Sequence, residues 1–294
     1  MDKGKAKGKK YKFIDLFAGI GGFHLAFHNV GAECVWVSEW DDPARKTYEA
    51  NFKKISPKVF KNGNFAGDIT KIDPETIPDF DILTGGFPCQ PFSQAGKKKG
   101  FNETRGTLFF NIAEILRIKK PKAFFIENVR NLKSHDGGNT FRVMEKIIKD
   151  LGYSFNYQII KASDYGLPTH RPRLYMVGFR DKNIEFKFPD PSKLKITLPE
   201  IFNGECDKKI GYTLRVGGKA SGLNDRHNWD TYLVDGKPHR ITVEEAQKMM
   251  GFPDDFVFPV TKNQAMKQLG NSVAVDAIRA TAKEIVKTLK KYDK

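Results

Sequence analysis

Cys89 is the residue whose surroundings point most directly to chemistry. It follows the apolar run FDILT, which predicts a strand, and it stands between Pro88 and the pair Gln90-Pro91. Because prolines constrain the backbone, we expect Cys89 to be accessible at a strand end, where a thiolate can act as a nucleophile. A second apolar run, KAFFI, ends in Glu127 and places a carboxyl group at the same edge. Together, the two groups could act on one ring: the thiolate could add to a ring carbon, and the carboxyl group could donate or accept a proton on the ring.

A glycine-rich turn is the second candidate site. The first predicted strand runs into the segment FAGIGGF at residues 17–23, which opens a helix. Glycines let a ligand approach the backbone closely, although such a turn can also be only a tight connection. Glu39 ends the next predicted strand, twenty positions after Gly19, where nucleoside-binding folds place a carboxylate on ribose hydroxyls. Trp40 beside it offers an aromatic face to an adenine.

Asp68, in the segment Gly67-Asp68-Ile69, is open to two interpretations. Its carboxylate could accept a hydrogen bond from an adenine amino group, or it could simply start a turn. The glycine turn reads G-x-G-G, which departs from the G-x-G-x-x-G of a dinucleotide site.

The hydrophobic pattern predicts a scaffold that would bring these strand ends together. Between residues 12 and 180, short apolar runs alternate with stretches whose apolar residues recur at helical spacing. This alternation predicts an α/β fold, a doubly wound and mostly parallel sheet with helices on both faces. Ligands of such sheets bind at the carboxyl ends of the strands. The predicted strands are KFIDLF, CVWVSEW, FDILTGG, KAFFIENV, QIIKAS and RLYMVGF, and the predicted helices are residues 41–52, 107–119, 140–150, 243–250 and a segment that begins at Ser272.

A change in composition and hydrophobic periodicity near residue 183 predicts a second, smaller domain. From there the sequence is charged, contains many Gly, Pro and Asn residues, and has little helical periodicity. We expect a larger domain at residues 1–182, to which residues 261–294 return, and a small domain with its hinge at 183–260.

The charge balance favours a polyanionic partner. The 294 residues carry a formal net charge of +15, and nucleic acid would be attracted regardless of its sequence. A coding preference for solvated lysine would give the same excess. Cys34, Cys89 and Cys206 are far apart and in no metal-binding spacing, so we expect no metal site and a reducing, cytoplasmic compartment. No apolar run approaches the ~18 residues of a membrane span, and the basic residues 1–12 lack the features of a secretion signal.

Eight motifs in order give the chain a specific resemblance. They are DLFAGIGG at 15–22, Glu39-Trp40, GDI at 67–69, GGFPCQPFS at 85–93, RGTLFF at 105–110, ENV at 127–129, RPR at 171–173 and QLGNSV at 268–273. In these motifs, which span nearly the whole chain, the protein resembles the bacterial DNA cytosine-C5 methyltransferases, the family that includes the HhaI and HpaII methyltransferases. The Pro-Cys pair and Glu-Asn-Val are the motifs that best distinguish this family, because many other methyltransferases share the glycine turn. The resemblance implies the methyltransferase fold that uses S-adenosylmethionine, with a small target-recognition domain.

The resemblance also implies catalytic roles. Cys89 would add to C6 of the target cytosine, Glu127 would hold N3 and the exocyclic amine, Arg173 would bind O2, and Arg171 would help anchor the site. The base must leave the stacked duplex first, at a cost of roughly a few kcal/mol. No metal is required.

The cofactor implied is S-adenosylmethionine, with S-adenosylhomocysteine as the product. By the same matching its pocket consists of Phe17, Gly19, Ile20, Gly22, Glu39, Trp40, Asp68, Ile69, Pro88, Leu108, Asn271, Ser272 and Val273.

The partner implied is double-stranded DNA, bound by a monomer that belongs to a restriction-modification or related bacterial or phage system. A cognate restriction endonuclease would act independently. The loop at 96–106 resembles the family's mobile catalytic loop, and recognition would come from residues 211–240. The candidate DNA contacts are Gln90, Ser93, Lys97, Lys98, Lys99, Arg105, Arg215, Lys219, Arg226 and His227. The target sequence is not readable, beyond a mild preference for guanine next to the cytosine.

Two departures from the family pattern stand out. Thr169 replaces the usual Gln of Gln-x-Arg-x-Arg, which puts in doubt how Arg173 is positioned. Lys248-Met249-Met250 replaces Arg-Leu-Gln, where we expect little effect on chemistry. A tRNA cytosine-C5 methyltransferase and a catalytically silent DNA-binding relative are the competing hypotheses. The chain lacks the Cys-Phe-Thr signature of the first, and the intact Cys89, Glu127 and Arg173 argue against the second.

Overall fold

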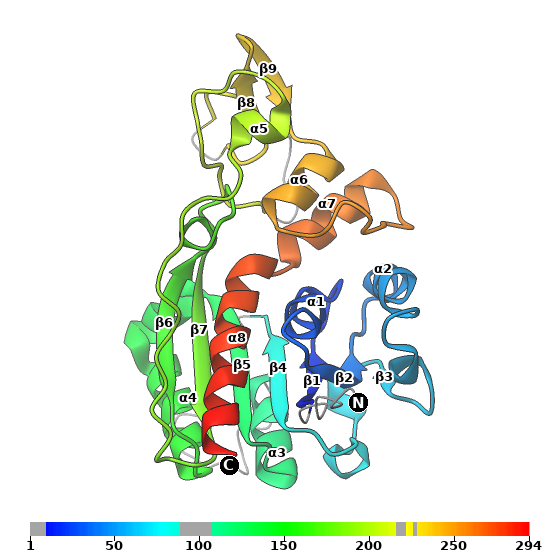
Figure 1. The fold of residues 1–294 in the computed structure, drawn as a ribbon, viewed down its shortest axis with the longest axis vertical. Coiled ribbons are helices and arrows are strands. Elements are labelled where there is room, and N and C mark those ends of the chain that lie inside the picture. The colour runs from blue at the N-terminus through cyan, green and yellow to red at the C-terminus, as the bar shows by residue number, and fades with distance from the viewer. Residues whose placement is uncertain (1–9, 89–107, 216–221, 226–227, 294) are drawn as a thin grey trace, which may run out of the picture.

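A seven-stranded sheet forms the centre of the molecule (Figure 1). The computed structural model describes residues 10–88, 108–215, 222–225 and 228–293. The strand order is β3-β2-β1-β4-β5-β7-β6, and every neighbouring pair is parallel except the two that involve β7. This confirms the predicted α/β fold with a mostly parallel sheet. The strands are β1 Lys12–Leu16, β2 Glu33–Ser38, β3 Phe65–Ala66, β4 Ile82–Gly86, β5 Ala123–Val129, β6 Asn156–Lys161 and β7 Pro172–Phe179.

Helices cover both faces of this sheet. Side chains that alternate along a strand point to opposite faces, as Phe124 and Phe125 of β5 do. Phe125 belongs to a hydrophobic cluster with residues of α1, α2 and α8, and Phe124 belongs to a second cluster with residues of α3 and α4. The helices are α1 Gly22–His28, α2 Asp42–Phe52, α3 Leu108–Lys119, α4 Asn139–Asp150, α5 Leu198–Phe202, α6 Val243–Met249, α7 Lys262–Asn271 and α8 Val275–Tyr292.

A smaller group of elements lies beyond the carboxyl ends of the parallel strands. It contains α5 and a hairpin of β8 Thr231–Val234 and β9 Lys237–Arg240, with α6 and α7 between it and the sheet (Figure 1). The chain reaches this group through residues 180–197, where Phe186 packs against Phe179 of β7 with ring centroids 5.5 Å apart. Part of the stretch predicted as the small domain therefore packs on the large sheet. No helix in the described part of the chain is long and apolar enough to cross a membrane.

The C-terminal helical region differs from the prediction. The helix expected from Ser272 begins at Val275, and residues 262–271 form a separate helix, α7. Ser272 and Ala274 have extended backbones, with ψ of 172° and 107°. A Cβ atom added to Gly22 of α1 would lie 2.6 Å from Cγ2 of Val273, so the extended link packs directly against α1.

Candidate catalytic and cofactor site

A cavity of about 640 Å³ opens where the parallel strands end. Its lining joins strand ends of the sheet to the α7–α8 link, segments that are far apart in the sequence. Gly22 and Val273 pack against each other outside this lining. The predicted residues that line the cavity are Phe17, Gly19, Ile20, Glu39, Trp40, Asp68, Ile69, Pro88, Leu108, Glu127, Arg171, Arg173, Asn271 and Ser272.

The glycine turn is shaped by tight packing as well as by its backbone angles. Gly19 and Gly21 have positive φ, 55° and 88°, which favours glycine. A Cβ atom on Gly21 would lie 2.3 Å from the ring of Phe52, whereas one on Gly19 would meet nothing within 4 Å. Gly21 therefore serves packing against α2, and Gly19 leaves the backbone open to the cavity.

Glu39 ties this turn to the start of α2. Its carboxylate accepts hydrogen bonds from the backbone N–H of Gly19 at 2.7 Å and of Asp41 at 2.8 Å. Burial raises the pKa of Glu39, and these N–H donors oppose that shift. A carboxylate offers about four lone pairs, so the backbone donors leave acceptor capacity for a ligand hydroxyl. The backbone partners were not predicted, because nothing in the sequence shows which N–H groups face the side chain.

Trp40 and Asp68 lie at the end of the cavity where the sequence predicts an adenine. The side chain of Trp40 is 77% exposed although it is large and apolar, so its ring is available to a ligand. Asp68 Oδ1 accepts from the backbone N–H and the hydroxyl of Thr70 at 3.0 and 2.8 Å, and these bonds lower the pKa of Asp68. Its Oδ2 has no hydrogen bond within the described part of the chain. Asp68 therefore starts a turn and also keeps an acceptor at the cavity.

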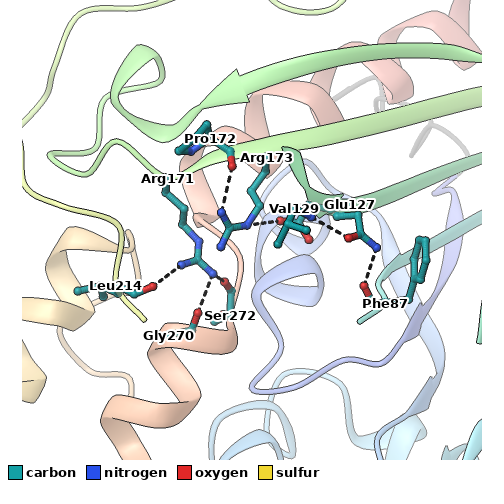
Figure 2. A network of polar contacts seen from close by, with 10 residues as sticks. Phe87, Glu127, Val129, Arg171, Pro172, Arg173, Leu214, Gly270 and Ser272 are labelled. Atoms are coloured by element: carbon teal, nitrogen blue, oxygen red, sulfur yellow. Dashed lines mark hydrogen bonds and ion pairs between the residues drawn. The ribbon is translucent and has the colours of Figure 1, made fainter. Parts of the chain in front are cut away.

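Buried Glu127 and half-buried Arg173 form an ion pair at the ends of β5 and β7, shown in Figure 2. Arg173 Nε lies 3.0 Å from Glu127 Oε1. Burial raises the pKa of Glu127, although the neighbouring guanidinium groups of Arg173 and Arg171 act in the opposite direction. Gly86 makes room beside the pair, since a Cβ atom there would lie 3.2 Å from Glu127 Oε2. A buried carboxyl group with a raised pKa can hold a proton next to a cation.

Arg171 is directed away from this pair (Figure 2). Its guanidinium donates to the carbonyl oxygens of Leu214 at 3.2 Å, Gly270 at 2.9 Å and Ser272. Burial lowers the pKa of Arg171 to about 9. Its φ of 25° lies in the left-handed region. The contacts make Arg171 a positioning residue that holds the α7–α8 link and the chain near Leu214, which suits its predicted role as an anchor.

Asn128, between Glu127 and Val129, holds the strand end that precedes Cys89. Its Nδ2 donates to the carbonyl of Phe87 at 2.8 Å, and its Oδ1 accepts from the backbone N–H of Val129. Sequence reasoning used this asparagine only as part of a motif and missed its contact.

Comparison with known proteins decides the family. The family model described as C-5 cytosine-specific DNA methylase matches residues 11–216 and 207–287. The chain belongs to this family. It is thus a DNA cytosine-5 methyltransferase, as the motifs predicted.

Two relatives illustrate how closely this methylase resembles type II methyltransferases. M.SsoII of Shigella sonnei is 44% identical, over 95% of this chain and 81% of that protein. M.HhaI of Haemophilus parahaemolyticus is 40% identical, over 95% of each. Among solved structures, a mutant of Spodoptera frugiperda DNMT2 has a TM-score of 0.72 at 19% identity, over 96% of this chain and 100% of that one. At that identity the likeness shows the fold alone.

The family implies S-adenosylmethionine, and the cavity of this methylase fits that molecule. The described lining carries four carboxylates, on Glu39, Asp41, Asp68 and Glu127, against three cations, on Arg171, Arg173 and Lys267. Among these acids, Glu39 and Asp68 present acceptors that suit the hydroxyl and amino donors of an adenosine. The exposed ring of Trp40 and the oxygen of Asp68 that makes no hydrogen bond within the described residues are a face and an acceptor of the kind that suits an adenine.

Thr169, which stands where the family usually has Gln, makes its side-chain hydrogen bond with a residue other than Arg173. Its hydroxyl donates to the carbonyl of Tyr212 at 2.8 Å. Arg173 is instead held by Glu127 and by the carbonyl of Pro172, at 3.0 Å. The substitution therefore joins residue 169 to the recognition segment, residues 211–240, and leaves the ion pair in place.

The structure places few of the proposed DNA contacts. Arg215 is exposed and makes no ion pair within the described residues, while Asp230 pairs with Arg240 at 3.2 Å. The remaining predicted residues lie outside the described part: Cys89, Gln90, Ser93, Lys97, Lys98, Lys99, Arg105, Lys219, Arg226 and His227.

Proposed function

We propose that the protein methylates C5 of a flipped-out cytosine in a specific short duplex sequence, with S-adenosylmethionine as the methyl donor and Cys89 as the covalent nucleophile. The observation that carries the proposal is the ion pair of Glu127 and Arg173 at a cavity whose lining also includes Pro88, the residue before Cys89. A carboxyl group beside a guanidinium is suited to the N3 and O2 edge of a cytosine.

The residues would act in the following sequence. The Cys89 thiolate forms a bond to C6 while Arg173 holds O2, and Glu127 shares its proton with N3 as negative charge develops on the ring. C5 then has enamine character and can form a carbon–carbon bond. Bound S-adenosylmethionine supplies the methyl group from its sulfonium. Loss of the C5 proton to water, departure of the Cys89 thiolate and return of the N3 proton to Glu127 restore the aromatic ring.

The cofactor would be held at the carboxyl ends of β1, β2 and β3. Glu39 would bind the ribose hydroxyls, Trp40 and Ile69 would flank the adenine, and Asp68 would accept from its amino group. The remaining wall would consist of Phe17, Gly19, Ile20, Pro88, Leu108, Asn271 and Ser272, while Gly22 and Val273 pack against each other outside this lining. No metal ion is needed for this chemistry.

Duplex DNA would be bound by two sets of side chains. Gln90, Ser93, Lys97, Lys98, Lys99 and Arg105 would close on the backbone and the flipped base, and Arg215, Lys219, Arg226 and His227 would read base edges. We further propose that the enzyme acts as a monomer in the cytoplasm of a bacterium or phage-infected cell. The type II relatives support a place in a restriction-modification system, whose endonuclease would act separately.

Methyl transfer from labelled S-adenosylmethionine to duplex DNA and to tRNA tests the substrate. We expect transfer to DNA and none to tRNA, and the reverse result would favour a tRNA methyltransferase. If neither substrate is labelled while DNA is still bound, the chain is a silent relative. Sequencing of the labelled DNA for modified cytosines would then give the recognition site.

A further inference from the structure

Arg45 of α2 connects the two chain segments that would enclose the adenosine. Its Nη1 donates to the carbonyl oxygens of Glu39 at 2.7 Å and Ala66 at 2.6 Å, and its Nη2 donates to the carbonyl of Phe65 at 3.1 Å. These carbonyls lie at the ends of β2 and β3. Arg45 itself does not line the cavity.

The end of β3 needs such support. β3 has only two residues and lies at the edge of the sheet, where it pairs with β2 alone. The backbone bond from Glu39 N–H to the Ala66 carbonyl, at 3.1 Å, is the last one that joins the two strands. Directly after Ala66 the chain continues into Gly67, Asp68 and Ile69, which line the cavity. A small shift of this edge strand would therefore move Asp68 relative to Glu39.

The guanidinium is suited to hold both strands at a fixed distance. It is planar, its donors point in fixed directions, and hydrogen bonds from a charged donor are about twice as strong as neutral ones. It also lies over the ring of Phe65, 4.0 Å from the centroid. Within the described residues no carboxylate pairs with Arg45, so its donors serve main-chain carbonyls. A lysine could reach one of the two strand ends, but it could not span both with fixed geometry.

We propose that Arg45 is a positioning residue that fixes the spacing between Glu39–Trp40 and Asp68–Ile69, and thereby sets the affinity for the cofactor. The inference rests on the proposed function, since it requires S-adenosylmethionine to bind in this cavity. The residue contributes to the binding of the cofactor and not to the chemical step. Its removal should raise the dissociation constant and the KM for the cofactor, and it should leave kcat at saturating cofactor unchanged.

Calorimetric titration of the full chain with S-adenosylmethionine and with S-adenosylhomocysteine tests this role. Hydrogen bonds to a charged group contribute about 1.5–3 kcal/mol, so Arg45→Ala should weaken binding by roughly ten- to a hundredfold. Arg45→Lys should lie between the wild type and Arg45→Ala. The kcat at saturating cofactor should stay within about twofold of the wild type, as for a residue that acts only on binding.

The matched control is Arg180→Ala. Arg180 is exposed whereas Arg45 is half-buried, and Arg180 likewise donates to a main-chain carbonyl, that of Lys120 at 2.6 Å. It follows β7 at the opposite end of the sheet, where Phe179 pairs with Ala123. This variant should bind both ligands as the wild type does.

Three results would overturn the inference. They are wild-type affinity in Arg45→Ala, equal loss of affinity in Arg180→Ala, and a fall in kcat that matches the rise in KM. If Arg45→Ala does not fold, Arg45→Lys tests the inference instead. Unchanged cofactor affinity in Arg45→Lys would show that the fixed donor directions of the guanidinium are not needed. Failure of the wild type to bind either ligand would instead contradict the proposed function.

Discussion

Two hollows of similar volume differ sharply in what surrounds them. The strand-end cavity, about 640 Å³, is lined by acids and bases most of which are buried or held by backbone groups. A groove of about 710 Å³ follows α8, which crosses the front of the sheet in Figure 1. The second is slightly larger, and four of the twelve residues that line it are exposed lysines.

The charge of the two linings shows what each can do. In the groove five cations, on Lys195, Arg279, Lys283, Lys287 and Lys290, face a single carboxylate, on Asp276. That carboxylate is already paired with Lys195 at 2.7 Å and with Arg279 at 2.5 Å. Such a surface attracts any polyanion, whereas opposed charges held in fixed positions can discriminate atoms of a ligand. Volume alone therefore does not locate the chemistry, and substitutions in the two hollows should have effects of different kinds.

The largest effect should follow from Cys89→Ala. If Cys89 adds to C6, its loss should reduce methyl transfer by on the order of 10⁴-fold or more, as removal of a nucleophile does. DNA that carries 5-fluorocytosine at the target should trap the wild type, because fluorine cannot leave C5 as a proton does. The measurement is a denaturation-resistant protein–DNA adduct formed with cofactor present.

Cys206→Ser is the control for trapping, because Cys206 is a free, partly buried cysteine of the hairpin region. It should form the adduct as the wild type does. An adduct in Cys89→Ala, or none in the wild type, would contradict covalent catalysis by Cys89.

Glu127→Gln should lower kcat by about 10²–10⁴-fold, the usual contribution of a positioned acid or base. The pKa of Glu127 is raised by burial, so its protonated form persists to higher pH than for an ordinary glutamate. Activity that depends on this proton is present at low pH and is lost as the pH rises through the raised pKa. The pH profile of kcat should therefore fall on the alkaline side in the wild type, and this limb should be absent in Glu127→Gln. The same limb in both proteins would assign the titration to another group.

Glu39→Ala should weaken S-adenosylmethionine binding by about 1–3 kcal/mol, through the loss of a charged acceptor. Equilibrium binding of cofactor, and separately of DNA without cofactor, measures the change, and DNA affinity should stay the same. Glu33→Ala is the control, since Glu33 begins the same strand and pairs with Lys58 at the surface. Equal loss of DNA and cofactor affinity in Glu39→Ala would show that Glu39 acts only by holding the turn.

Arg215→Ala should cost about 1–3 kcal/mol on the cognate site and little on other DNA, if its exposed guanidinium reads a base. Arg226→Ala should behave in the same way. Arg240→Ala provides the contrast, because it removes the partner of buried Asp230 and should lower the melting temperature instead. An unchanged ratio of cognate to non-cognate binding in Arg215→Ala would remove it from the recognition set.

The smallest effect should come from the α8 groove. Lys283→Ala with Lys290→Ala should weaken binding to all DNA alike and reduce the slope of log affinity against log salt by about one for each phosphate that is no longer neutralised. Ala substitutions in the Lys97–Lys99 run should have the same signature. Fluorescence anisotropy at several salt concentrations measures it. A change in kcat or in the preference for the cognate site in the Lys283→Ala, Lys290→Ala variant would show that the α8 groove does more than attract DNA.

The sequence predicted the framework of the sheet better than the contacts within it. The six longer strands have clear apolar runs, but β3 is too short to show one. The sequence predicts a helix through the link at residues 272–274, which is wrong because the extended form of this link depends on packing against α1. Residue types such as Glu39 and Trp40 mark a site by their position at strand ends. The partners of Arg45, Asn128 and Arg171 are main-chain groups from other parts of the chain, and no local pattern reveals them.

The way in which the recognition segment is attached has a consequence for how specificity can change. Gly211 exchanges backbone hydrogen bonds with Pro168 and His170, and Thr169 and Arg171 donate to the carbonyls of Tyr212 and Leu214. Every acceptor or donor that residues 211–214 contribute to these bonds belongs to the main chain. These bonds therefore do not depend on the side chains of residues 211–214, although Gly211 must stay small, because a Cβ atom there would lie 2.7 Å from Met249 and Tyr232. A segment of different sequence that keeps this glycine and follows the same path could be exchanged there without disturbing Arg173 and Glu127.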